Sequence, residues 1–350
     1  MTPPDPAPYG ATWYAATMAP VPERAPPAQD LDVDVCVIGG GLAGLTTARE
    51  LARRGWSVAV LEANRIGWAA SGLNTGFVLP GFSEDVADMI ERVGLDRTKE
   101  LWALSERGLD YVRRTIEETG MPGVSPVPGW LYVSKTDNTA ALRTEVERLR
   151  WIGAQAEFWP KEKVRAALPN ERYFDALHLT NAFHIQPLNY TLGLAAAAEA
   201  AGARIFEQTE AIEIDPTGIR KRVSTPLAKL RADHVVLAGN VHLGALMPQI
   251  AETLLPISTF VVVTEPIANL RQVIRWRGGV SDGARADNHY RVLPGRRLLW
   301  SGRMRTWEAD PRKFAAANSA QGCRHVFAYS LIDNLRSNRQ ISPFCSVRDQ

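Results

Sequence analysis

Asp34-Val-Cys-Val-Ile-Gly-Gly-Gly-Leu-Ala-Gly-Leu45 is the stretch of this sequence that decides the fold. The β-branched run from Val33 to Ile38 predicts a strand that is buried on both faces. Residues 45–54 then predict a helix that ends at Gly55, and residues 57–61 predict a second buried strand. The stretch therefore predicts a strand–helix–strand unit.

Three glycines between the first predicted strand and the helix have the spacing of a dinucleotide-binding turn. Gly39 permits the tight turn, and Gly41 lets backbone amides approach a diphosphate. Gly44 allows the helix to pack closely on the strand. The helix start at Leu42 and Ala43 adds unpaired N–H donors and the positive end of the helix dipole.

Glu62 ends the second predicted strand, where a carboxylate can accept hydrogen bonds from both ribose hydroxyls of an adenosine. A glycine-rich turn without a nucleotide is the alternative interpretation. The glycines, the flanking strands and the terminal glutamate together favour a dinucleotide site. An NAD domain usually continues with short strand–helix units, whereas a loop over residues 65–82 and two long amphipathic helices follow here, which favours FAD.

The rest of the chain shows further helical and strand patterns. Helices are predicted around 86–93, 101–116, 142–149, 160–167 and 192–201. Strands are predicted at 129–133, 204–207, 212–215, 234–238 (buried) and 259–263, and at 291–293 and 298–301, which Pro294-Gly295 joins as an antiparallel pair. These patterns indicate an α/β protein with an α+β second domain.

A longer stretch after the second strand carries a resemblance to a known family. Residues 61–76 read Leu-Glu-Ala-Asn-Arg-Ile-Gly-Trp-Ala-Ala-Ser-Gly-Leu-Asn-Thr-Gly. Together with residues 34–45, they resemble the D-amino-acid oxidase superfamily of FAD-dependent oxidoreductases, nearest to its gamma-glutamylputrescine oxidoreductase-like branch. The family usually has Ala-Ser-Gly-Arg-Asn-Gly-Gly here, so Leu73 and Thr75 depart from its pattern. Shorter similar stretches extend the resemblance over about 11–316.

The resemblance implies FAD as the cofactor and implies which residues hold it. Ser71 and Asn74 to Gly76 would approach the diphosphate, the ribityl chain and the flavin ring, and Arg65 would lie beside the ADP moiety. Ala211 would contact adenine through its backbone. The whole expected cofactor set is Gly39, Gly41, Leu42, Ala43, Gly44, Glu62, Ala63, Arg65, Ser71, Asn74, Thr75, Gly76, Ala211, Ala238 and Gly239.

The resemblance also implies a Rossmann-like FAD-binding domain interleaved with an antiparallel-sheet substrate domain. Residues 1–30 are dense in proline, which predicts an extended lead segment without regular helix. The expected division of the remainder is an FAD-binding domain at 31–85 and 187–248, a substrate domain at 86–186 and 249–317, and an atypical tail at 318–350.

Three residues are candidates for the substrate side of such a site. Side chains alternate along a strand, so only one of Tyr290 and Arg291 should face the cavity. Arg291 would bind a substrate carboxylate in bidentate fashion or form a surface salt bridge. Tyr290 would hydrogen-bond the substrate or cover the flavin. His184 would line the site or deprotonate an ammonium group, or it would be a structural histidine.

The expected activity is oxidation of a C–N bond in a small amine or amino acid by hydride transfer to flavin N5, after which water hydrolyses the imine. Dioxygen is the expected electron acceptor. Two alternatives stay open. Residues 318–350 contain a single glycine, Gly322, and lack the glycine-rich segment with which the family closes over the flavin, so the chain could be a truncated, catalytically impaired remnant. A hydroxy-acid oxidase would share every cofactor motif.

Composition excludes several other classes of protein. A net charge of +2 with interleaved acidic and basic residues argues against a nucleic-acid partner. Three cysteines without a Cys-x-x-Cys pair, and six histidines without ligand spacing, argue against a metal site and a disulfide framework and fit a reducing cytoplasm. The sequence shows neither a signal peptide nor an apolar run that could cross a membrane, so we expect a cytoplasmic protein without membrane partners.

Overall fold

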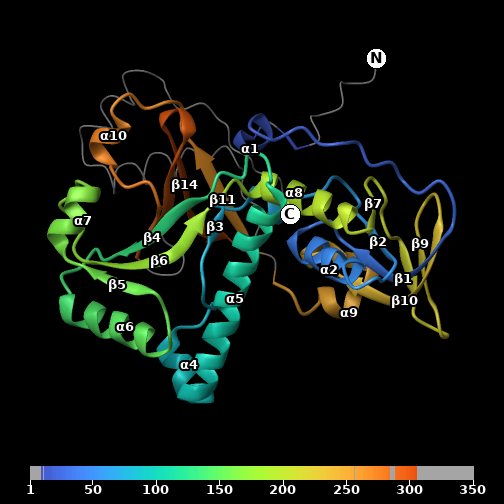
Figure 1. The fold of residues 1–350 in the computed structure, drawn as a ribbon, viewed down its shortest axis with the longest axis horizontal. Helices are drawn as coiled ribbons and strands as arrows, with labels where there is room; N and C mark the ends of the chain where they lie inside the picture. The colour runs from blue at the N-terminus through green and yellow to red at the C-terminus, as the bar shows by residue number, and fades with distance from the viewer. Residues whose placement is uncertain (1–8, 11, 256, 284–287, 306–350) are drawn as a thin grey trace.

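A computed structural model describes residues 9–10, 12–255, 257–283 and 288–305. Within this part of the chain the strands form two sheets, one of six strands and one of eight. The two sheets lie in opposite halves of the molecule, and the long helix α5 (Leu95–Thr119) runs beside the eight-stranded sheet toward the centre (Figure 1). The protein is therefore a mixed α/β fold.

The six-stranded sheet grows from the strand–helix–strand unit that the sequence predicts. Its strand order is β7-β2-β1-β10-β9-β8, with parallel pairing from β7 through β10 and antiparallel pairing beyond. The strands are β1 (Leu31–Ile38), β2 (Val58–Leu61), β7 (Arg204–Phe206), β8 (Glu213–Asp215), β9 (Lys221–Ser224) and β10 (Lys229–Leu237).

Two helices cover one face of this sheet, α2 (Leu42–Ala52) and α8 (Pro187–Ala200). Their apolar residues, such as Leu45 and Leu194, join one core cluster with alternate residues of β1 and β2. This shared core packs α2 and α8, which are far apart in the sequence, against β1 and β2.

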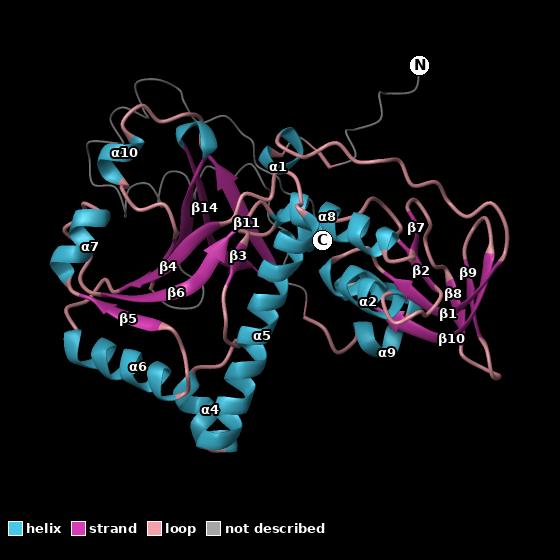
Figure 2. Ribbon diagram, viewed as in Figure 1, coloured by secondary structure: helices cyan, strands magenta, loops and turns pink. Residues whose placement is uncertain are grey.

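The eight-stranded sheet forms the other half of the molecule (Figure 2). Its order is β11-β14-β13-β12-β4-β6-β3, and β5 also pairs with β6. The strands are β3 (Phe77–Val78), β4 (Val127–Val133), β5 (Ala156–Trp159), β6 (Ala176–His184), β11 (Ser258–Val263), β12 (Gly279–Asp282), β13 (Asn288–Leu293) and β14 (Arg297–Arg305).

Helices also pack on this second sheet. Residues of α6 (Thr139–Trp151) share a core cluster with β5 and β6, and α7 (Lys161–Ala167) shares another with β4, β12 and β13. The remaining elements are α1 (Trp13–Ala16), α3 (Ala70–Leu73), α4 (Val86–Val93), α9 (Pro248–Ala251), α10 (Leu270–Val273), and the 3₁₀ turns η1 (Asn240–Leu246) and η2 (Pro294–Arg296).

Most predicted elements are present, but the strands β3, β5, β6, β9 and β12 were not predicted. Three further differences concern the predicted segments. The lead segment contains the helical turn α1, because the interval between Pro8 and Pro20 is free of proline and Thr12 caps it. The strand predicted at 234–238 belongs to β10, but His234 is exposed and the residues after it are half-buried. β3 lies in the range 31–85 that the sequence gives to the first domain, yet it pairs with β6 of the second sheet.

The expected tail at 318–350 lies outside the described residues. Within the described residues, every helix is too short or too polar to cross a membrane.

Candidate functional site

The glycine-rich turn borders a cavity of about 460 Å³ at the carboxyl ends of β1 and β2. We call it the glycine-lined cavity. Its walls come from the turn after β1, from the end of β2, and from two later segments at 210–212 and 238–246. A crevice at the carboxyl ends of parallel strands is where open α/β sheets bind their ligands.

Each of the three predicted glycines is needed for a different close approach. Gly39 has φ +115°, and a Cβ there would lie 2.5 Å from the Ala238 carbonyl oxygen. A Cβ on Gly44 would lie 2.0 Å from the Gly39 carbonyl oxygen. A Cβ on Gly41 would lie 2.8 Å from Ser71 Oγ and would enter the cavity wall. The first and third glycines therefore serve the fold, and Gly41 keeps the cavity open.

Glu62 lies in the wall of the same cavity. Its carboxylate accepts hydrogen bonds from the Gly40 amide (2.7 Å) and the Asn64 amide (2.8 Å). Burial raises the pKa of this carboxyl, and the nearby Glu207 adds to the effect. A carboxylate accepts about four hydrogen bonds, so Glu62 keeps capacity for ribose hydroxyls.

The segment after Glu62 forms a loop that leads from this cavity toward the second sheet. Ser71 Oγ accepts from the Leu42 amide at the start of α2 (3.0 Å), and Asn74 Oδ1 accepts from the Gly76 amide (2.8 Å). Gly76 has φ +78°, and a Cβ there would lie 2.2 Å from the Ile185 carbonyl oxygen. The segment from Ser71 to Gly76 includes the end of α3 and is thus held at both ends. We call it the cofactor loop, because the resemblance predicts that it contacts FAD.

The expected cofactor residues do not all line the glycine-lined cavity. Those that do are Gly39, Gly41, Glu62, Ala63, Ser71, Ala211, Ala238 and Gly239. Leu42, Asn74 and Gly76 line an adjoining groove, which also contains Ser71. Ala43, Gly44, Arg65 and Thr75 line neither.

Arg65, which the resemblance predicts beside ADP, does not line the glycine-lined cavity and pairs with a glutamate. Its Nη1 donates to Glu207 Oε2 (2.9 Å), and Glu207 also accepts from the Ile66 amide (2.8 Å). The Glu207 side chain is buried, and Arg65 balances its charge. In the described structure Arg65 thus pairs with Glu207 beside the ends of β2 and β7, and its contact with ADP stays a prediction.

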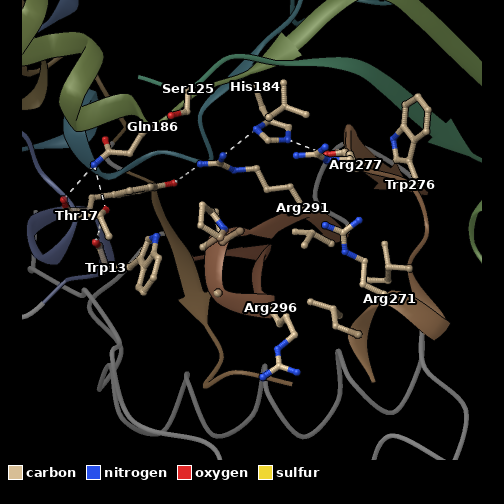
Figure 3. Close-up of a pocket in the computed structure, with 18 of the residues that line it drawn as sticks. Trp13, Thr17, Ser125, His184, Gln186, Arg271, Trp276, Arg277, Arg291 and Arg296 are labelled. Atoms are coloured by element: carbon tan, nitrogen blue, oxygen red, sulfur yellow. Dashed lines mark hydrogen bonds between the residues drawn. The ribbon is translucent and has the colours of Figure 1, made fainter. Parts of the chain in front are cut away.

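A second cavity, of about 740 Å³, lies beside the eight-stranded sheet and contains Arg291 (Figure 3). We call it the arginine-lined cavity. Arg291 is 4% exposed and comes from β13. Its Nη1 donates to His184 Nδ1 (2.9 Å) and its Nη2 donates to Tyr14 Oη (3.0 Å). Tyr14 Oη in turn donates to the Asn74 carbonyl oxygen of the cofactor loop (2.8 Å).

The guanidinium of Arg291 has no counter-ion among the described residues. Its two described partners are a neutral phenol and an imidazole, and its buried Nε has no hydrogen-bond acceptor in the described part of the chain. A Cβ on Gly76 would lie 2.9 Å from Arg291 Nη2, so the cofactor loop touches this cation. A buried cation without an anion is costly and favours an anionic ligand.

His184 has both ring nitrogens engaged. Nε2 faces the Arg277 carbonyl oxygen (3.0 Å), so this nitrogen carries the hydrogen and Nδ1 accepts from Arg291. Burial and the Arg291 charge lower the pKa of His184 to about 3. The imidazole is therefore neutral and orients Arg291.

Tyr290 points to the opposite side of β13. It is fully buried, its ring stacks on Trp300 with centroids 5.0 Å apart, and its Oη lies 3.1 Å from Tyr173 Oη. Tyr173 also donates to Asp282 (2.7 Å). The expectation that one of two neighbours faces the cavity holds, and Arg291 is that residue; Tyr290 belongs to the core of the sheet.

Sequence reasoning missed several residues of the arginine-lined cavity. Tyr14 and Gln186 form part of its wall, and Gln186 Nε2 donates to the Tyr14 carbonyl oxygen (3.1 Å). No local pattern reveals a contact across 172 residues. Arg271 and Arg277 also line it, and the arginine-rich run 271–277 was a visible signal. Among the described residues, no group of His, Cys, Asp or Glu is arranged to hold a metal ion.

A strand–helix–strand unit with a glycine-lined cavity at the carboxyl ends of its strands is the arrangement of a dinucleotide-binding fold. The second sheet is mixed, because β12 pairs with β4 in parallel while its other described pairings are antiparallel. The family profile described as "DAO: FAD dependent oxidoreductase" matches residues 34–348. The chain belongs to this family, and FAD is the family's cofactor. The match extends beyond residue 316, where the resemblance read from the sequence ends.

Curated relatives and solved structures agree with this assignment. The chain is 32% identical to gamma-glutamylputrescine oxidoreductase of Escherichia coli over 81% of this chain and 67% of that protein. It is 31% identical to the probable oxidoreductase OrdL of Haemophilus influenzae over 79% of this chain and 66% of that protein. The aligned part thus spans about two thirds of those relatives.

Two solved structures share the fold at low sequence identity. L-proline dehydrogenase from P. horikoshii superposes with a TM-score of 0.65 at 21% identity, covering 88% of this chain and 79% of that chain. Glycine oxidase from Geobacillus kaustophilus superposes with a TM-score of 0.62 at 20% identity, covering 80% of this chain and 73% of that chain.

Proposed function

We propose that this protein is an FAD-dependent oxidoreductase that oxidises a C–N bond of an amine or amino acid carrying a carboxylate. The observation that carries the proposal is the buried guanidinium of Arg291, which lacks a described counter-ion and touches the cofactor loop at Gly76. The relatives and neighbours named gamma-glutamylputrescine oxidoreductase and glycine oxidase support an amine-type substrate.

The glycine-lined cavity fits the ADP half of FAD. Gly41 leaves space that a Cβ would fill, the positive end of the α2 dipole lies beside that space, and Glu62 lines the cavity as the proposed ribose acceptor. FAD, when bound, supplies the hydride acceptor for oxidation of the C–N bond. The cofactor loop from Ser71 to Gly76 would carry the remainder of the cofactor toward Arg291.

Arg291 is the proposed substrate-binding residue. Two guanidinium N–H groups are used by His184 and Tyr14, and the remaining donors are available to a carboxylate. Holding the carboxylate fixes the substrate's α-carbon relative to the cofactor loop, which is the positioning that this chemistry requires from a protein. The cost of the buried charge is relieved when the anion binds.

His184 is proposed as a positioning residue rather than a general base. Its Nδ1 accepts from Arg291 and its Nε2 donates to Arg277, so neither nitrogen is free to take a proton from the substrate. The substrate would therefore react as the neutral amine, with the proton lost to solvent on binding. Water then hydrolyses the imine product.

Reduction of bound FAD under anaerobic conditions tests the proposal. We expect the flavin absorption bands to bleach with a panel of carboxylated amines and not with the corresponding hydroxy acids. Arg291→Met should abolish bleaching while FAD stays bound, and Arg97→Met, at an exposed position on α5, should behave as wild type. Bleaching by hydroxy acids alone, or full activity of Arg291→Met, would overturn the assignment.

The proposal also covers the electron acceptor and the cellular location. Dioxygen is proposed as the electron acceptor that reoxidises the flavin. The chain is proposed to act in the cytoplasm, since Cys36 is buried as a free thiol and the sequence has no Cys-x-x-Cys pair.

A further inference from the structure

The arginine-lined cavity is more cationic than the binding of one carboxylate requires. Among the described residues, five arginines contribute to its lining, and no aspartate or glutamate does. Arg291 forms the buried floor, while the other four are exposed. Figure 3 shows Arg271, Arg277, Arg291 and Arg296 around this one cavity.

None of the four exposed arginines, Arg271, Arg275, Arg277 and Arg296, has an ion pair within the described part of the chain. The neighbour of the last one, Arg297, pairs with Glu265 (3.1 Å) and donates to the Thr264 carbonyl oxygen (2.8 Å). Arg275 donates weakly to the Ala166 carbonyl oxygen (3.4 Å). Arg297, which has an ion pair, thus follows directly after Arg296, which lines the cavity without a described ion pair, and Arg275 has a carbonyl oxygen as its partner.

Arg296 has a backbone conformation that residues with a side chain rarely adopt. Arg296 has φ +59°, a conformation that glycine adopts freely and that a side chain makes costly. It follows Gly295 in the turn η2, which closes the β13–β14 hairpin beside Arg291. The turn therefore presents a charged side chain to the cavity at a conformational cost.

Like charges around a low-dielectric cavity raise its positive potential and attract anions. One carboxylate bound to Arg291 would neutralise the buried charge at the floor of the cavity. The exposed charges of Arg271, Arg277 and Arg296 at its rim would still have no described anion beside them. The cavity volume of about 740 Å³ is within the range of small-molecule sites. Trp13, Leu270 and Trp276 add apolar surface to the lining of the same cavity, which suits a methylene chain.

We propose that Arg271, Arg277 and Arg296 form a second anion-binding subsite, so that the preferred substrate is an amine with two carboxylates joined by a short methylene chain. This inference rests on the proposed function for the identity of the reacting group, but binding of the two carboxylates does not depend on turnover. The carboxylate next to the amine binds Arg291, and the distal carboxylate binds the rim.

Calorimetric titration of the FAD-loaded full chain with glutarate and with pentanoate tests the subsite. These probes have the same number of carbons and differ by one carboxylate. We expect glutarate to bind at least about tenfold more tightly. The double variant Arg271→Ser/Arg277→Ser should remove this preference, and Arg97→Ser, a matched exposed arginine on α5, should retain it.

Arg296→Gly provides a second variant that removes a rim charge and relieves the positive φ, so it should fold at least as well as wild type. It should reduce the preference for glutarate several-fold. Equal binding of glutarate and pentanoate by the wild type, or an unchanged preference in both rim variants, would overturn the proposal.

Binding of glutarate and bleaching of the flavin test the second subsite and the proposed oxidation independently. Tight glutarate binding without bleaching by any amine would leave the subsite standing and contradict the oxidation. Bleaching by alanine and aspartate with equal efficiency would leave the oxidation standing and contradict the subsite.

Discussion

At the scale of single residues, a short chain of hydrogen bonds links the cavity floor to the cofactor loop. Arg291 donates to Tyr14, and Tyr14 donates to the Asn74 carbonyl oxygen. Tyr14 is buried, and desolvation raises the pKa of its phenol, so the hydroxyl remains a donor at working pH. Tyr14 therefore positions both the proposed carboxylate-binding group and the loop beside it.

Tyr14→Phe tests whether Tyr14 positions Arg291 for a carboxylate in addition to stabilising the fold. The change removes two buried hydrogen bonds, so we expect a loss of about 1–3 kcal/mol in the free energy of unfolding and a several-fold rise in the dissociation constant for pentanoate. Tyr9→Phe is the matched control, because Tyr9 donates to the Ile66 carbonyl oxygen (3.0 Å) away from Arg291. Equal effects of both variants on pentanoate binding, measured by calorimetry, would contradict this role.

His184 predicts a pH dependence of stability. Its pKa in the fold, about 3, lies below the ordinary value of 6.5, so the unfolded chain binds a proton that the folded chain does not. The stability associated with neutral His184 is full above pH 6.5 and is lost as the pH falls from 6.5 toward 3.

Urea denaturation at two pH values measures this effect. Between neutral pH and about pH 4.5, wild type should lose about 2 kcal/mol more unfolding free energy than His184→Gln. His234→Gln, at an exposed position of β10, should lose as much as wild type. An identical pH dependence in wild type and His184→Gln would show that the imidazole titrates normally.

Part of this detail could be read from the sequence. Alternation along a strand predicts that one of Tyr290 and Arg291 faces the cavity, but the choice depends on the register of β13 between β12 and β14. The partner of Arg65, Glu207, lies 142 positions away and meets it through the pairing of β2 with β7. Such contacts follow from tertiary structure and leave no local pattern.

At the scale of elements, the β1–α2 turn contains two glycines at which a Cβ would meet backbone and one, Gly41, whose Cβ would enter the wall of the glycine-lined cavity. A Cβ on Gly44 would collide with backbone, at 2.0 Å from the Gly39 carbonyl oxygen. A Cβ on Gly41 would meet the side-chain atom Ser71 Oγ, at 2.8 Å, which can rotate away. The φ of Gly41 is −91°, which any residue can adopt.

Alanine at these two positions should therefore give opposite results. Gly44→Ala should cost about 3 kcal/mol of unfolding free energy because backbone has to shift. Gly41→Ala should fold almost normally and bind FAD at least about tenfold more weakly, because its methyl group occupies the diphosphate cradle. Thermal unfolding and quenching of FAD fluorescence measure the two quantities. Normal FAD affinity in Gly41→Ala would place the diphosphate elsewhere.

Among the elements, those with strong local patterns were predictable. β1, α2 and β2 follow from buried β-branched runs and a glycine stop. β6, which carries His184 at its end, was not predicted, because Thr180 and Asn181 interrupt its apolar alternation. It is a strand because β4 and β5 pair with it on opposite sides. Long-range pairing overrides weak local preference there.

At the scale of the whole molecule, a buried arginine connects the two halves. Arg49 of α2 donates to Tyr111 (2.9 Å), Thr115 (3.2 Å) and Glu118 (3.1 Å) of α5. The Arg49 side chain is 5% exposed, whereas its α2 neighbour Arg53 is 51% exposed and reaches the same glutamate at 3.9 Å. Arg49 therefore fixes the long helix α5 against the half of the molecule that contains the six-stranded sheet.

Removing this connection should lower stability. Arg49→Met should cost about 2 kcal/mol of unfolding free energy, because polar groups of α5 lose a buried partner. Arg53→Met should cost less than about 0.5 kcal/mol, as is usual for exposed ion pairs. Urea denaturation of the two variants gives the comparison, and similar losses from both would show that burial of Arg49 is not what matters.

The start of α2 and the Glu62 carboxylate are proposed to hold FAD in the glycine-lined cavity. The most direct test is titration of the FAD-free protein with FAD, followed by flavin fluorescence. Glu62→Ala should raise the dissociation constant at least about tenfold, while Glu213→Ala, at an exposed position of β8, should leave it unchanged. Equal FAD affinity in wild type and Glu62→Ala would contradict the account.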